Sequence, residues 1–177
     1  MYYGIFGGAT KWSKVLIANF NKQKCKLVFT CSKFLKTKKN ITDIKKLPNI
    51  VNFIVIATNP CKNLKLLNLF KNIYIFCEKP ILPNYKQYEK ITKRNNNFIF
   101  CNYQHIYSEP IIFLKKKLLN KKNFKIIIKF GKNGKQRNIL PSYEWLPHPL
   151  SILFYWGISL NNAKIFNENY KNKFKQN

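Results

Sequence analysis

Apolar and polar residues follow two rhythms along the first hundred residues. Short runs rich in β-branched and aromatic residues predict strands over 2–8, 26–32, 51–59, 73–80 and 97–105, the first of them ending in two glycines. Between them, apolar residues at helical spacing predict helices over 11–22 and 60–72, and a short polar helix is expected over 84–95. The run at 51–59 is apolar on both faces, which is typical of a buried parallel strand. Strands that alternate with helices indicate a doubly wound parallel sheet of the α/β class.

The rhythm changes after Ser108. The pattern predicts a helix over 110–120, a strand that runs into a glycine-containing turn over 123–137, and a compact apolar helix over 148–160 that is closed by Gly157. The Lys-rich stretch 33–46 is expected to be loop with a weak, solvated helix. We therefore predict two units, a Rossmann-type domain over 1–102 and a partial α+β domain over 103–177.

The composition favours a folded chain in spite of its charge. Hydrophobic residues make up 46% of a chain with a net charge of +27, which is too apolar for a disordered polycation. Such a charge attracts polyanions. However, lysine is spread along the whole chain, and the only arginines are Arg94 and Arg137, whereas recognition of phosphate and guanine favours arginine. We interpret the charge mainly as codon drift, which argues against nucleic acid as a partner.

Cysteine usage and the chain start bear on the compartment. The 5 cysteines form no CxxC pair and only 2 histidines accompany them, which argues against a metal site or a disulfide framework. The first residues lack the layout of a secretory signal. The longest uncharged stretch, 145–163, is interrupted by prolines and argues against a membrane span. We expect a cytoplasmic protein.

Polar and small side chains gather where the predicted strands end, the edge at which open α/β sheets bind ligands. After the first strand, a turn followed by a helix could hold a dinucleotide phosphate on backbone N–H groups. The glycine fingerprint is incomplete, and a plain tight turn explains this segment equally well. The candidate residues of the turn are Gly7, Gly8, Thr10, Trp12 and Ser13.

Two further strand ends offer polar residues. Ser32 and Lys33 suit a ribose 2′-phosphate, which favours NADP over NAD, although in a Lys-rich chain a solvated surface is the simpler reading. The third strand ends with Thr58, Asn59 and Pro60, a polar rim that could contact a cofactor. Ordinary turn chemistry accounts for that rim as well.

The segment CEKP, residues 77–80, ends the fourth strand with a charged pair before a proline. Lys79, with Glu78 beside it, is well placed to polarise or protonate a substrate hydroxyl or carbonyl next to a nicotinamide, or else forms an exposed pair at a turn. His148 lies between two prolines ahead of an apolar helix and could act as acid or base, or pack at a junction. The same two readings apply to His105.

Taken in order, these pieces resemble the glucose-fructose oxidoreductase and inositol dehydrogenase family of nicotinamide-dependent sugar oxidoreductases. The resemblance covers about residues 2–157 and lies in IFGGATKWSKVL, FIVIATNP, IYIFCEKPIL, CNYQHIYSEP and GKQRNILPSYEWLPHPLSI. It implies that Lys79 contacts the nicotinamide ribose and substrate, and that His148 serves as acid or base. Trp145 resembles part of a Trp-x-Pro-His segment found in a subgroup thought to act on surface-polysaccharide sugars, which also tends to carry an arginine where Arg137 stands.

The chain departs from the family pattern in three ways. Glu144 and Ser151 stand where aspartates are usual, the glycine fingerprint is eroded, and most of the second domain's sheet is missing. The resemblance implies NAD(P)-dependent hydride transfer to or from a sugar or sugar nucleotide, with His105, Arg137 and Trp145 toward the substrate and a homo-oligomer left open. The alternative is a catalytically silent, degenerate Rossmann module with a binding or vestigial role.

Overall fold

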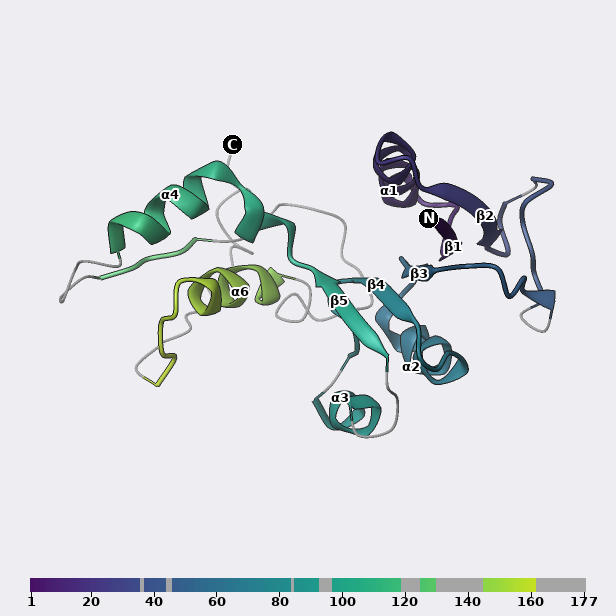
Figure 1. The fold of residues 1–177 in the computed structure, drawn as a ribbon. Helices are drawn as coiled ribbons and strands as arrows, with labels where there is room; N and C mark the ends of the chain where they lie inside the picture. Colours follow the sequence, from purple (N-terminus) through teal and green to yellow (C-terminus); the bar gives the residue numbers. More distant parts are fainter. Residues whose placement is uncertain are drawn as a thin grey trace, which may run out of the picture.

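Five parallel strands form the centre of the molecule (Figure 1). The computed structural model describes residues 1–35, 37–43, 46–83, 85–92, 97–118, 125–129 and 145–161. The strands are β1 (Tyr2–Phe6), β2 (Lys26–Cys31), β3 (Phe53–Ile56), β4 (Tyr74–Glu78) and β5 (Phe98–Asn102), in the order β2-β1-β3-β4-β5. Every neighbouring pair runs parallel. The predicted α/β parallel sheet is confirmed.

Helices cover the two faces of this sheet unequally (Figure 1). Helix α1 (Lys11–Lys22) lies on one face, and α2 (Pro60–Leu69) and α3 (Tyr85–Thr92) lie on the other. The central strands are therefore enclosed from both sides, and their residues are apolar on both sides, as a buried parallel strand requires. All three helices were predicted from the sequence pattern.

An aromatic cluster fixes α1 to the sheet. Tyr3 of β1 packs on Phe20 of α1 and on Phe53 of β3, with ring centroids 5.2 and 5.3 Å apart. Phe20 also meets Phe76 of β4 edge-on at 5.3 Å. Such ring pairs each contribute about 0.5–1.5 kcal/mol beyond the burial of their area. On the other face, Leu66, Leu67 and their neighbours form the larger core cluster.

The link from β2 to β3 departs from the prediction. The described residues within 33–46 contain no α-helix, so the expected weak helix is wrong there. Instead, Asn40 forms a parallel bridge with Thr30, and its side-chain amide donates to the carbonyl oxygens of Ser32 and Leu35. Local side-chain bonds of this kind compete with a helix, and the Lys-rich stretch has no apolar face to favour one.

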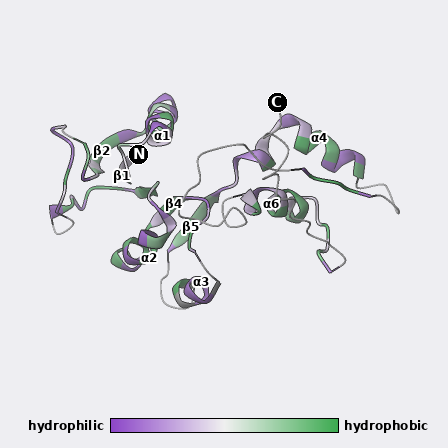
Figure 2. Ribbon diagram, turned by 180° about the vertical axis from the view of Figure 1, so that it is seen from behind, coloured by the Kyte–Doolittle hydropathy of each residue, from purple (hydrophilic) through white to green (hydrophobic). Residues whose placement is uncertain are grey.

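Beyond β5 the chain forms a short 3₁₀ helix, η2 (Gln104–Tyr107), then α4 (Glu109–Leu118) and, further on, α6 (Pro147–Tyr155). Helix α4 carries both hydrophobic and hydrophilic residues, whereas α6 is predominantly hydrophobic (Figure 2). The Trp156 indole N–H donates to the carbonyl oxygen of Ile111 at 3.0 Å, which ties the end of α6 to α4.

The segment 125–129 forms neither helix nor strand, so the strand predicted over 123–137 is wrong for this part. Exposed and half-buried residues still alternate along it, but no described strand pairs with it, and the pattern alone does not make a ladder. A domain boundary at residue 102 stays a prediction. Among the described residues, no helix has the length and apolar character needed to cross a membrane.

Candidate active site

The carboxyl ends of the strands bring the predicted residues to one edge of the sheet. The register pairs Phe6 with Ile56, Ile56 with Cys77, and Glu78 with Asn102. The turns that follow these strands therefore lie beside one another. In open α/β sheets this edge holds the ligand, at the point where the strand order reverses, here between β1 and β3.

Gly7 sets the first turn. Its φ of +86° lies in the left-handed region, and a Cβ there would come within 2.4 Å of the Ala57 carbonyl oxygen at the end of β3. Only glycine permits both the conformation and this close approach. At the buried Gly8, an added Cβ would lie 3.2 Å from the Thr30 side chain, which is tight but less severe.

Thr10 and Ser13 hold the start of α1. The Thr10 hydroxyl accepts from the Ser13 N–H at 3.0 Å, and the buried Ser13 hydroxyl donates to the Gly7 carbonyl oxygen at 2.6 Å. Among the described residues, nothing accepts from the N–H groups of Lys11 and Trp12. Free N–H groups at the positive end of a helix suit a diphosphate. The turn thus fits a dinucleotide, although Ser13 is used within the turn itself.

At the end of β2, the backbone of Ser32 is fixed by Asn40, whose side-chain oxygen accepts from the Ser32 N–H at 3.0 Å. The Ser32 hydroxyl accepts from the Phe34 N–H at 3.3 Å, and Lys33 is exposed. No acidic residue occurs between positions 32 and 42. The Ser32 hydroxyl and Lys33, with no carboxylate nearby in the sequence, fit a ribose 2′-phosphate. Binding of a 2′-phosphate by these two residues stays a prediction.

Asn63 organises the third and fourth strand ends, a role that sequence reasoning missed. The Thr58 hydroxyl donates to its side-chain oxygen at 2.6 Å, and its amide donates to the Ile81 carbonyl oxygen at 2.8 Å. Asn59 caps α2 by accepting from the Cys61 N–H at 3.0 Å, with Pro60 in the first helical turn. The one signal in the sequence is a polar residue on the apolar face of this helix.

Glu78 and Lys79 follow β4. Asn102 of β5, which the sequence reasoning also passed over, donates from its amide to a Glu78 carboxylate oxygen at 2.6 Å and joins the two strand ends. The next peptide bond, Lys79–Pro80, is cis. The Lys79 ammonium lies 5.5 Å from the centre of the Trp145 ring, within the range of a cation–π interaction.

His148 completes the cluster from the start of α6. Its side chain is only 3% exposed, and its ring meets that of His105 edge-on, with centroids 4.5 Å apart. The Trp145 ring lies 6.3 Å away. Burial, together with the positive charge of Lys79 and the nearby His105, lowers the pKa of His148 to about 4. A neutral imidazole beside an ammonium at neutral pH can accept a proton.

Four of the predicted residues from three segments therefore meet: Lys79, His105, Trp145 and His148. The lysine and the histidine lie within electrostatic reach although nearly seventy positions separate them in the sequence. Arg137 and Glu144 lie outside the described residues. The Ser151 hydroxyl donates to the His148 carbonyl oxygen at 2.7 Å, so this side chain bonds to the backbone of its own helix.

Comparison with known proteins finds likeness in structure but none in sequence. No family model matches the chain, and no curated protein matches it. The solved structure of the WlbA (WbpB) dehydrogenase from Thermus thermophilus in complex with NAD and UDP-GlcNAcA matches with a TM-score of 0.58 and 14% identity. The match covers 70% of this chain and 48% of that one.

Two inositol dehydrogenases match over the same part. A myo-inositol dehydrogenase from Corynebacterium glutamicum has a TM-score of 0.58 at 13% identity, covering 68% of this chain and 41% of that one. Myo-inositol 2-dehydrogenase from Lactobacillus plantarum has a TM-score of 0.53 at 19% identity, with the same coverage. The chain thus matches less than half the length of these dehydrogenases. At such identities the likeness establishes the fold, which is Rossmann-type.

Proposed function

We propose that this protein is a nicotinamide-dependent oxidoreductase of the glucose-fructose oxidoreductase and inositol dehydrogenase family. It transfers hydride to or from the hydroxyl-bearing carbon of a sugar or sugar nucleotide. The observation that carries the proposal is the meeting of Lys79 and the buried His148 beside the strand ends that suit a dinucleotide. Solved structures of this fold with NAD or NADH support the choice of cofactor.

The cofactor supplies the hydride acceptor or donor when it is bound. The N–H groups at the start of α1, beside Gly7, would hold its diphosphate. The Thr58–Pro60 rim and the Glu78–Lys79 pair border the same edge further along the sheet. Ser32 and Lys33 favour NADP as the dinucleotide.

In the direction of oxidation, His148 and Lys79 have different roles. A ring nitrogen of His148 takes the proton of the reacting hydroxyl, and the Lys79 ammonium stabilises the negative charge that develops on its oxygen. The low pKa of His148 keeps the imidazole neutral before the reaction, because burial and, after it, the charge of Lys79 disfavour a positive charge on the ring. In reduction the proton follows the reverse path, from solvent through the His148 ring nitrogen to the carbonyl oxygen.

Trp145 and His105 limit the space around this pair. Their rings flank His148, and Trp145 also lies beside the Lys79 ammonium. The indole ring of Trp145 suits the apolar face of a sugar, and the imidazole of His105 suits its hydroxyl groups. We place Arg137 on the substrate side as well, by its resemblance to the sugar-acting subgroup.

The test measures the absorbance of reduced nicotinamide with the full chain. NAD or NADP is supplied with a panel of sugars and sugar nucleotides, and substrates are varied until one turns over. Lys79→Ala and His148→Ala are expected to lower kcat by about 10²–10⁴-fold, the usual contribution of acid–base groups. The exposed Lys116→Ala serves as the matched control and keeps its rate. Equal turnover in all variants, or no turnover with any substrate, contradicts the proposal, and the second result favours a silent module.

A further inference from the structure

Among the described residues, no helix covers one face of the sheet near β5. Phe76 packs against Phe20 of α1, but beyond it Tyr74 and Phe98 are 63% and 68% exposed, and Phe100 and Tyr107 are exposed as well. On the opposite face of β4, Ile75 and Cys77 are fully buried. We call Tyr74, Phe98, Phe100 and Tyr107 the aromatic face. A cluster of large exposed rings marks a site of interaction.

The rings of the aromatic face are already stacked on one another. Tyr74 stacks on Phe98 with centroids 5.2 Å apart, and Phe100 stacks on Phe76 at 5.4 Å and on Tyr107 at 6.4 Å. Phe100 stacks on two rings, whereas Tyr74 and Phe98 each use one ring face on the other and keep most of their surface exposed. The exposed faces and edges of Tyr74 and Phe98 suit apolar side chains.

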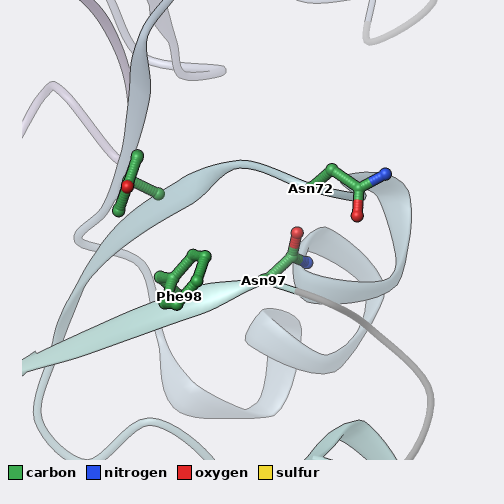
Figure 3. A pocket seen from close by; sticks show the side chains of 4 residues that line it. Asn72, Asn97 and Phe98 are labelled. Atoms are coloured by element: carbon green, nitrogen blue, oxygen red, sulfur yellow. The ribbon is translucent and has the colours of Figure 1, made fainter.

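A hollow of about 510 Å³ adjoins this face and is lined by Asn72, Tyr74, Asn97 and Phe98 (Figure 3). The Asn97 side chain is held in place by two hydrogen bonds. Its amide donates to the Phe70 carbonyl oxygen at 2.7 Å, and its oxygen accepts from the Ile73 N–H at 3.2 Å. Asn72 lies on the turn opposite, with φ of +55°. Such a hollow beside exposed rings can hold one anchoring side chain of a partner.

The hollow is separate from the candidate active site. It lies at the amino ends of β4 and β5, whereas Glu78 and Asn102 lie at their carboxyl ends. Strands of this length separate the two edges by about 13 Å. Changes to Tyr74 and Phe98 therefore leave the strand ends that border the cofactor untouched.

The net positive charge of the chain indicates which kind of partner binds this face. With 33 basic and 6 acidic residues, two copies of this chain repel each other, and a partner of negative charge is attracted. The exposed Lys71 directly precedes the turn that carries Asn72. We propose that the aromatic face and its hollow bind an acidic polypeptide that places an apolar side chain against Tyr74 and Phe98.

The experiment selects peptides from a random display library on the full-length protein and removes those that also bind a Tyr74→Ala/Phe98→Ala double variant. The remaining peptides are expected to be rich in Asp and Glu with an apolar anchor. A synthetic copy of the strongest peptide should bind the double variant at least about tenfold more weakly, as measured by fluorescence anisotropy. Phe34→Ala, which removes a ring that is 87% exposed and lies elsewhere, is the matched control and should bind normally. Thermal unfolding checks that both variants stay folded: Phe34→Ala should keep the wild-type midpoint, and the double variant, which loses the Tyr74–Phe98 stack, should unfold cooperatively at a slightly lower one.

Several outcomes overturn the proposal. A selection that yields no peptide specific for the wild type, or only neutral or basic peptides, contradicts it. A labelled single-stranded oligonucleotide that binds more tightly than the peptide and is lost in the double variant would assign the face to nucleic acid. Dimerisation of the wild type that disappears in the double variant, measured by sedimentation, would assign it to a second copy of the chain.

Discussion

At the scale of single residues, Gly7 decides how closely the first turn approaches the end of β3. The left-handed φ and the short distance to the Ala57 carbonyl oxygen are two separate demands. Gly157, which closes α6, has a φ of +74° with nothing within 4 Å of an added Cβ, so it carries only the first demand. A comparison of Gly7 with Gly157 therefore separates the cost of a left-handed backbone from the cost of a steric clash.

Replacing Gly7 with alanine is therefore expected to cost more than replacing Gly157. Gly157→Ala should lower the free energy of unfolding by about 1 kcal/mol, the usual cost of a left-handed alanine. Gly7→Ala adds the clash and should cost about 2–4 kcal/mol. Urea unfolding of both variants measures the difference, and equal losses would show that the turn is not held against β3.

His148 gives a prediction on pH. Its pKa falls from 6.5 to about 4 on folding, so between these values the unfolded chain binds more protons than the folded one. The free energy of unfolding therefore rises with pH over this range. The contribution of His148, on the order of 3 kcal/mol, is fully present above about pH 6.5 and is lost as the pH falls toward 4.

Urea unfolding at several pH values tests this, because His148→Gln should remove most of the dependence. His105→Gln keeps His148 and should keep most of the slope. An unchanged slope in His148→Gln would mean that the histidine is not buried as described.

Sequence reasoning reached some residues of the site and missed others for a physical reason. Lys79 and His148 stand out because prolines and strand ends mark their positions. Asn63 and Asn102 are ordinary polar residues in the sequence, and their importance lies in partners supplied by other elements, Thr58, Ile81 and Glu78. Only the folded arrangement reveals them.

At the scale of elements, α2 connects the ends of β3 and β4 through the buried Asn63. Its side chain bonds to Thr58 after β3 and to Ile81 after β4. The segment that carries Lys79 is therefore held by a helix that precedes it in the chain.

Asn63→Ala should lower the free energy of unfolding by about 2–3 kcal/mol, because the Ile81 carbonyl oxygen loses its partner in the interior. The control is Asn52→Ala, which removes an exposed bond to the Tyr2 N–H and should cost less than about 1 kcal/mol. Chemical denaturation compares the two, and a loss no larger than that of the control would argue against the link.

Hydrophobic rhythm was enough to predict β1 to β4 and the helices α1 and α2, since these elements supply most of the two core clusters. The exposed β5 and the polar α3 were predicted as well, although they bury much less. The rhythm failed for 33–46, where bonds of the Asn40 side chain shape the loop, and for 125–129, where no described neighbour pairs with the segment. Periodicity reports which side chains are buried, but a strand also needs a partner.

At the scale of the whole molecule, the parallel sheet brings the turn of Gly7, the Thr58 rim and the Lys79 pair to one edge, and α6 brings His148 to the same place. Trp12 lies in the first turn of α1 and Trp145 beside Lys79, so tryptophans stand near both ends of the proposed crevice. Trp156 bonds to Ile111 at the far end of α6.

Titration of the protein with NADH and NADPH, followed by tryptophan fluorescence, tests the shared crevice most directly. We expect saturable quenching with a Kd below about 1 mM, which corresponds to at least ~4 kcal/mol of binding free energy. Trp12→Phe and Trp145→Phe should each lose part of the quenching, whereas Trp156→Phe should keep it. No saturable signal below about 1 mM with either dinucleotide, or quenching that depends on Trp156 alone, would contradict a cofactor between the Gly7 turn and the Lys79–His148 pair.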